Sequence, residues 1–198
     1  MSRKIKIFLA LVVIVVAGYV AGGRLGFSAN GVPVEFKDAR GQGAIVAQDI
    51  VNVSNGLSGE LEVINKLDEQ GNHTEALMKT VELLRRTQEV KAKALDLSGE
   101  LEKMTGGLAS IKSAEARQAA LESITNRLAL IGRLLSYSDY LAQLTNSLRV
   151  RFSGGSVQEN HIKNLIAQIN AEVTAINNFN KQAGQAMDRF DAIVENEE

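Results

Sequence analysis

Residues 156–195 read SVQENHIKNLIAQINAEVTAINNFNKQAGQAMDRFDAIVE, and they carry a regular hydrophobic pattern. Apolar side chains recur every seven residues, and a second series follows the first at a spacing of four. This spacing predicts one long α-helix that buries a continuous seam against neighbouring helices. The two series are Ile162, Ile169, Ile176, Ala183 and Phe190, and Ile166, Val173, Asn180, Met187 and Val194.

Three further segments show a helical period, so we predict an all-α chain. The four helices are expected over about residues 44–70, 73–111, 114–152 and 156–195. The breaks between them are short, which makes consecutive helices antiparallel neighbours. The economical arrangement is an extended up-down-up-down four-helix bundle, a rod of about 60 Å at 1.5 Å per residue.

The segment 114–152 has the broadest apolar face of the four. Two heptad series run along it, and further leucines widen the stripe. We therefore expect this helix to contact two neighbours. The series are Leu121, Leu128, Leu135 and Ala142, and Ile124, Ile131, Ser138 and Thr145, widened by Leu134, Leu141, Leu144 and Leu148.

Two places weaken the helical pattern. The adjacent Gly106 and Gly107 cost a helix roughly 2 kcal/mol together, so we expect fraying or a kink there and a turn before Ser113, which begins the next helix. In the first helix, residues 51–56 (VNVSNG) also fit the approach to an Asn-Gly hairpin. We favour helix because the apolar period continues on both sides of Gly56.

Residues 5–23, IKIFLALVVIVVAGYVAGG, form a short apolar segment without an acidic residue, and basic residues precede it. This layout predicts a single-pass transmembrane or signal-anchor helix with its N-terminus inside and the bundle on the extracytoplasmic side of the cytoplasmic (inner) membrane. The alternatives are a signal peptide that is cleaved after export and a buried core segment. Residues 24–43 are interpreted as a Gly-rich juxtamembrane linker, with a short extended piece around Val34, before a bundle domain at 44–198.

Composition argues against several classes of function. The chain has no cysteine, which excludes disulfides and thiolate chemistry, and its net charge of -1 does not favour nucleic-acid binding. No phosphate-binding loop and no hydrolase motif is present, so we expect neither an enzyme nor a cofactor. His73 and His161 begin helices at the same end of the predicted bundle, but the Glu-x-x-His pairs of di-iron bundles are absent, so no metal site is expected.

Six polar residues are the candidate contacts for a ligand or partner. Those on the third helix, with Ser138 beside them, offer a polar pocket, although tyrosines in such a place more often serve amphipathic packing. Those on the fourth helix include Asn180 on the apolar seam, where a buried asparagine typically fixes register. The candidates are Tyr137, Asp139, Tyr140, Asn177, Asn178 and Asn180.

The sequence LSGELE occurs at residues 57–62 and again at 97–102. Paired sites on two helices would explain the repeat. We favour a simpler interpretation, in which Gly59 and Gly99 permit close approach of helices while the glutamates remain solvated.

These features predict a membrane-anchored extracytoplasmic scaffold or protein-interaction module of the cell envelope. It would bind a protein partner or a second copy of itself. The alternative is a sensing or small-ligand-binding bundle coupled to another membrane protein. In outline, a short anchor followed by an exported helical bundle is similar to LemA-type bacterial membrane proteins and to the periplasmic bundles of bacterial receptors, a similarity of architecture that carries over no functional residue.

Overall fold

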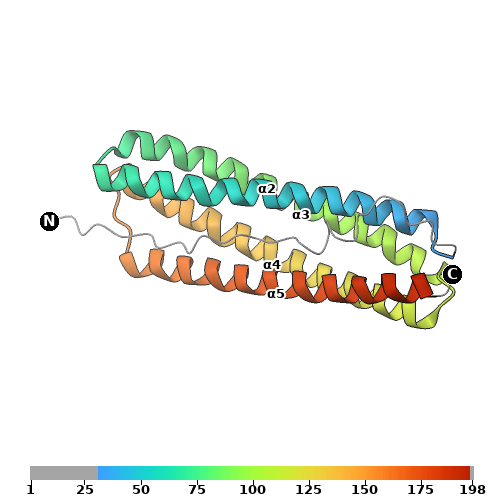
Figure 1. Ribbon diagram of the computed structural model, residues 1–198. Helices are drawn as coiled ribbons and strands as arrows, with labels where there is room; N and C mark the ends of the chain where they lie inside the picture. Colours follow the sequence, from blue (N-terminus) through green and yellow to red (C-terminus); the bar gives the residue numbers. More distant parts are fainter. Residues whose placement is uncertain (1–30, 197–198) are drawn as a thin grey trace.

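A computed structural model describes residues 31–196, and this part of the chain forms four long helices. They are α2 (Val34–Gln70), α3 (His73–Gly107), α4 (Ala114–Phe152) and α5 (Glu159–Asn196), with a short 3-10 turn, η1 (Leu108–Ser110), after α3. Consecutive helices run antiparallel along a rod (Figure 1). The described residues contain no strand, which confirms the prediction of an all-α chain with four helices.

Turn residues end and begin the helices where the sequence predicted breaks. Gly71 has a φ of 77°, the left-handed conformation that suits glycine after a helix, and its N–H donates to the Asp68 carbonyl at 3.1 Å. The Asn72 side chain then accepts a hydrogen bond from the Glu75 N–H, and Ser113 accepts one from the Ala116 N–H in the same way. These caps satisfy N–H groups that have no partner inside a first helical turn.

The first helix is longer than expected and begins at Val34 instead of residue 44. The extended piece predicted around Val34 is therefore wrong, as is a linker that continues to residue 43. Pro33 directly precedes the first helical residue, where a missing N–H costs nothing because first-turn N–H groups lack helical partners. The buried side of this added part is formed by Phe36, Ala39 and Gly43.

The paired glycines end α3 at Gly107, short of the predicted boundary at residue 111. A Cβ placed on Gly107 would lie 3.1 Å from the Cβ of Phe36, so the absence of a side chain lets α2 begin close to the end of α3. The last helix also starts later than expected, at Glu159 instead of residue 156. Residues 51–56 are helical, so the Asn-Gly hairpin is excluded.

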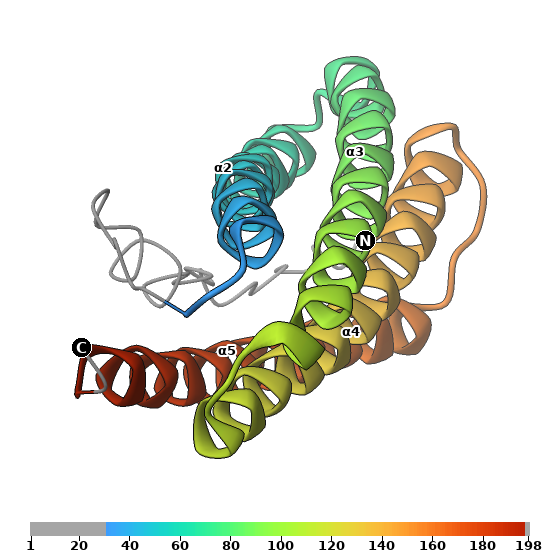
Figure 2. The ribbon, with the colours of Figure 1, turned by 90° about the vertical axis from the view of Figure 1, so that its right-hand side faces the viewer.

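Three helix pairs pack closely along the rod. These are α2 with α3, α3 with α4, and α4 with α5, whereas α2 and α5 hardly approach each other along their backbones. Viewed along the rod, the helices follow an open curve with α2 and α5 at its two ends (Figure 2). Near the start of α2, the rings of Phe36 and Phe190 bring these two helices into contact, with centroids 5.4 Å apart.

The predicted seam of α5 lies in the core. Every member of the two series is buried except Ile166, which is partly buried. The seam includes Asn180, which is 7% exposed, so the prediction that a polar residue occupies the core of this helix is confirmed.

The apolar segment 5–23 lies outside the described residues. Among residues 31–196, no helix is both long enough and apolar enough to cross a membrane.

Candidate protein-interaction face

Among the candidate residues on α4, Tyr137 and Tyr140 lie three residues apart on one side of the helix, whereas Asp139 lies on another side. Tyr137 is buried, and burial raises the pKa of its hydroxyl to about 12. Tyr140 is half-buried against the core. Asp139 lies on the outer side of α4, where its Oδ1 accepts a hydrogen bond from Lys91 Nζ of α3 at 3.0 Å.

The candidate asparagines on α5 differ in burial. Asn180 is buried, Asn177 is half-buried and Asn178 is exposed. The Oδ1 atom of Asn177 is inaccessible to solvent and has no hydrogen-bond partner among the described residues. The three asparagines therefore do not share one surface of α5.

An ionic cluster that the sequence did not reveal lies at the α2–α3 turn. Arg151 Nη2 of α4 donates to Asp68 Oδ2 at 2.8 Å, and the Asp68 side chain is only 5% exposed. His73 Nδ1 lies 3.7 Å from the other oxygen of Asp68, and its ring stacks on Phe152. This cluster ties the α2–α3 turn to the end of α4. His161 is exposed, and the described residues contain no group of three or more histidine or acidic side chains that could hold a metal ion.

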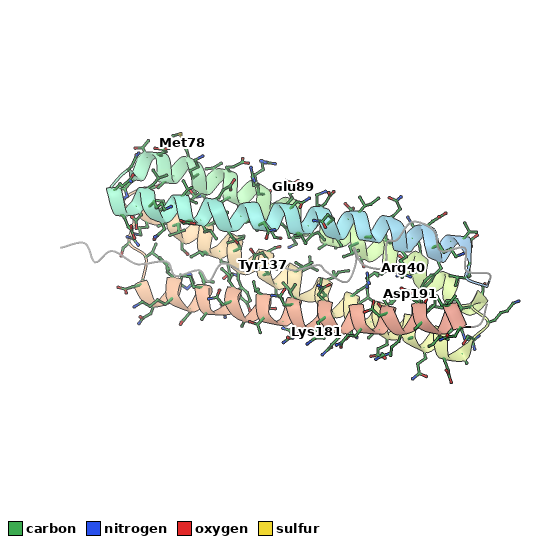
Figure 3. All side chains as sticks on the ribbon, viewed as in Figure 1. Arg40, Met78, Glu89, Tyr137, Lys181 and Asp191 are labelled. Atoms are coloured by element: carbon green, nitrogen blue, oxygen red, sulfur yellow. The ribbon has the colours of Figure 1, made fainter. Side chains whose placement is uncertain are left out.

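A second ionic cluster joins α2, α4 and α5 near the other end of the rod. Arg40 and Asp191 point toward each other between α2 and α5 (Figure 3). Arg127 of α4 is 3% exposed, and desolvation lowers its pKa to about 10 although Asp191 opposes the shift. Arg127 Nε donates to Ser123 Oγ, which in turn donates to the Ala183 carbonyl of α5 at 2.9 Å. These contacts hold three helices in register.

The outer surface of α3 and α4 carries large apolar side chains that are about half exposed to solvent. Leu121 and Leu128 of α4 are 50% and 46% exposed, and Val81 and Leu95 of α3 are each 57% exposed. The expectation that the Leu121 heptad series contacts a neighbouring helix of this chain is therefore wrong at its first two positions. The other series of α4 supplies the core. We call the strip formed by Val81, Leu95, Leu121 and Leu128 the outer α3/α4 face.

Helical spacing places these four residues along one strip. Leu121 and Leu128 are one heptad apart, and Val81 and Leu95 are two heptads apart, so each pair repeats on one side of its helix. The ion pair of Lys91 with Asp139 bridges α3 and α4 on this same outer side. Leu95 follows Lys91 by four residues, which is about one helical turn.

Two glycines leave space beside the leucines. A Cβ placed on Gly99 of α3 or on Gly132 of α4 would meet no atom within 4 Å. The same is true of Gly59 in the other copy of the LSGELE sequence, so the prediction that Gly59 and Gly99 permit close helix approach is wrong. The prediction of solvated glutamates is wrong for Glu60, whose side chain is 18% exposed and pairs with Arg86 at 3.0 Å, and for Glu100, whose side chain is 16% exposed and pairs with Lys103 at 2.7 Å.

Comparisons of the chain with protein-family models, with curated proteins and with solved structures find no match.

Proposed function

We propose that this protein is a membrane-anchored, extracytoplasmic scaffold or protein-interaction module of the cell envelope. The observation that carries the proposal is the outer α3/α4 face, where heptad-spaced leucines remain exposed although the bundle has a complete core of its own. Isolated exposed apolar residues are ordinary, but an aligned set along two neighbouring helices is typical of a surface that binds another protein.

The sequence of residues 5–23 supports the membrane part of the proposal. The segment is apolar, lacks acidic residues and follows the basic Arg3 and Lys4. Helix α2 begins at Val34, so ten residues, 24–33, separate the proposed anchor from the bundle. With so short a connection, we expect the start of α2 to lie near the membrane and the α2–α3 turn to lie far from it.

Isolation of the full-length protein from its native membrane in mild detergent tests the interaction role. Proteins that copurify are identified by mass spectrometry for the natural chain and for two charged variants. Leu128→Asp changes the outer α3/α4 face, whereas Ile45→Asp changes an equally exposed position on α2. The partner is either a different protein in stoichiometric amount or a second copy of this chain. We expect this partner to be lost in Leu128→Asp and retained in Ile45→Asp. The same partner in all three samples would contradict the proposed face.

The anchor is tested separately by mass analysis of the mature N-terminus and by alkaline extraction of membranes. We expect Met1 or Ser2 at the N-terminus and retention in the membrane pellet. A chain that begins at Gly23 or Arg24 and is released into the soluble fraction would show signal cleavage and would refute the anchor.

A sensing or ligand-binding bundle is the second candidate, and one observation favours it. Ser54 Oγ of α2 and Asn177 Oδ1 of α5 are inaccessible to solvent and have no partner among the described residues. Buried polar atoms normally find a hydrogen-bond partner, so a small polar solute between these helices would satisfy them. A thermal-shift screen with polar metabolites tests this candidate. We expect stabilisation in the natural protein and a smaller shift in Asn177→Leu.

A further inference from the structure

We propose that the outer α3/α4 face binds a second copy of this chain, as a parallel two-fold dimer. This inference rests on the proposed function, because it names the partner of the interaction module.

The shape of the face is self-complementary. Lys91 of α3 and Asp139 of α4 are in contact, and α3 and α4 are antiparallel. The order of residues is taken along the rod from this ion pair toward the α3–α4 connection. In this direction Leu95 precedes Gly99 on α3. On α4, which runs the other way, Gly132 precedes Leu128. Each helix therefore offers one exposed leucine and one open glycine, in opposite order.

A two-fold axis parallel to the rod places each of these leucines opposite a glycine of the second copy. Such an axis places α3 of one copy against α4 of the other without changing heights along the rod. Leu95 then lies opposite Gly132 of the second copy, and Leu128 lies opposite Gly99, each to within about one helical turn. The glycines leave the space that a leucine requires, as in knobs-into-holes packing.

The charges of the face favour the same arrangement. Lys91 is on α3 and Asp139 is on α4, so the axis that brings α3 against α4 of the second copy also brings Lys91 toward the opposite charge of Asp139. An α3-to-α3 arrangement would instead place lysine near lysine. Parallel copies also have both α2 helices starting at the same end, as two chains anchored in one membrane require.

The area of the face meets the requirement of a stable dimer. From Val81 to Leu121 the strip is about 42 Å long at 1.5 Å per residue, and two adjacent helices are about 20 Å wide. The product is about 840 Å² for each copy, close to the roughly 800 Å² of a standard interface.

Multi-angle light scattering of the full-length protein in mild detergent measures the oligomeric state. We expect a dimer whose dissociation constant rises about tenfold or more in Leu95→Asp and in Leu128→Asp. Ile45→Asp and Val63→Asp, which are exposed positions on α2, should leave the dimer unchanged. Gly132→Leu distinguishes loss of binding from loss of folding. The space beside Gly132 accommodates the new side chain in the monomer, but in the dimer that side chain occupies the space that Leu95 of the second copy requires. We expect Gly132→Leu to raise the melting temperature of the monomer and to abolish the dimer.

Cysteine crosslinking tests the orientation, since the chain has no cysteine of its own. Chains with Val81→Cys are mixed with chains that carry either Asn146→Cys or Leu121→Cys, and the mixture is oxidised. We expect the first mixture to crosslink because both positions lie toward the α2–α3 turn. A crosslink only in the second mixture would show an antiparallel dimer and would overturn the proposal.

The outcomes also separate this inference from the proposed function. A monomeric protein that copurifies with a different stoichiometric protein would refute the second-copy partner and leave the interaction module supported. A monomer without any partner would refute both. A dimer formed by a chain that has lost residues 1–23 would refute only the anchor.

Discussion

Arg40 near the start of α2 forms a two-pronged ion pair with Asp191 near the end of α5. The Nη1–Oδ1 distance is 2.6 Å and the Nη2–Oδ2 distance is 2.7 Å, and the two side chains are 17% and 15% exposed. The residues are 151 positions apart in the chain, and they join two helices whose backbones hardly approach each other. The ion pair and the ring contact of Phe36 with Phe190 therefore both hold the start of α2 against the end of α5.

Loss of Asp191 should destabilise the protein more than loss of Arg40. Asp191 opposes the charges of both Arg40 and the buried Arg127, so Asp191→Asn leaves two guanidinium groups without their carboxylate. We expect Asp191→Asn to cost about 3 kcal/mol and Arg40→Gln about 1 kcal/mol of unfolding free energy. Chemical denaturation of both single variants and the double variant measures the coupling. Equal effects of the two single changes would argue against an interaction of Asp191 with Arg127.

A charge in the core of α5 tests the assigned helix register. Ile169 is fully buried, so Ile169→Asp should place an unpaired carboxylate among apolar side chains and cost several kcal/mol. Ala171→Asp, two residues away on the exposed side of the same helix, is the matched control. The measurement is the melting temperature by circular dichroism. An unchanged value for Ile169→Asp would refute the register.

Two glycines should respond to alanine in opposite ways. Gly59 lies inside α2 with open space around it, so Gly59→Ala should raise stability by about 0.5–1 kcal/mol through the helix preference of alanine. Gly71 has a φ of 77°, which an alanine adopts only with strain, so Gly71→Ala should lower stability by about 1 kcal/mol. Urea unfolding of both variants gives the sign directly. A gain in stability from Gly71→Ala would contradict the left-handed conformation at this turn.

Tyr137 should make stability depend on pH in the alkaline range. Its pKa rises from an ordinary value of 10.0 to about 12 because burial disfavours the charged phenolate. The folded state therefore favours the neutral hydroxyl, and this contribution is fully present below about pH 10 and is lost as the pH approaches 12. We expect the natural protein to lose about 2 kcal/mol more than Tyr137→Phe between pH 9 and pH 12.

Ultraviolet absorbance of tyrosinate provides a second measurement on the same variant. The buried hydroxyl of Tyr137 should ionise only near pH 12 in the folded protein. The difference between the natural protein and Tyr137→Phe should thus appear only near pH 12. A difference already present at pH 10 would show that the hydroxyl is accessible to water.

Much of the fold could be predicted from the sequence because its signals are local. The seam of α5 needs only the spacing of residues such as Ile169 and Val173, and Gly71 with Asn72 marks a helix end by backbone chemistry. The start of α2 was missed because Gly41, Gly43 and Pro33 suggested a linker. The signal that would have placed it is the spacing of Phe36, Ala39, Gly43 and Ala47, which continues the buried side of the helix toward its start.

The candidate site could be predicted only in part. The apolar breadth of α4 indicated two neighbours, but periodicity cannot distinguish a stripe that contacts α3 or α5 from one that faces solvent. Tyr137 and Asp139 are close in sequence, yet one is buried and the other is exposed, because 200° of rotation separates them around the helix. The ion pairs of Arg40 with Asp191 and of Arg151 with Asp68 join distant positions, and no local pattern identifies such partners.

The helical class, the breaks between helices and the buried side of α5 follow from residue spacing, since each depends on residues within a few turns of one another. The apolar character of residues 5–23 is likewise read from the sequence. Spacing along α4 does not show that Leu121 and Leu128 lie outside the core while Ile124 and Ile131 lie inside it. That choice depends on the directions from which α3 and α5 approach α4, and these are set by the packing of the whole bundle.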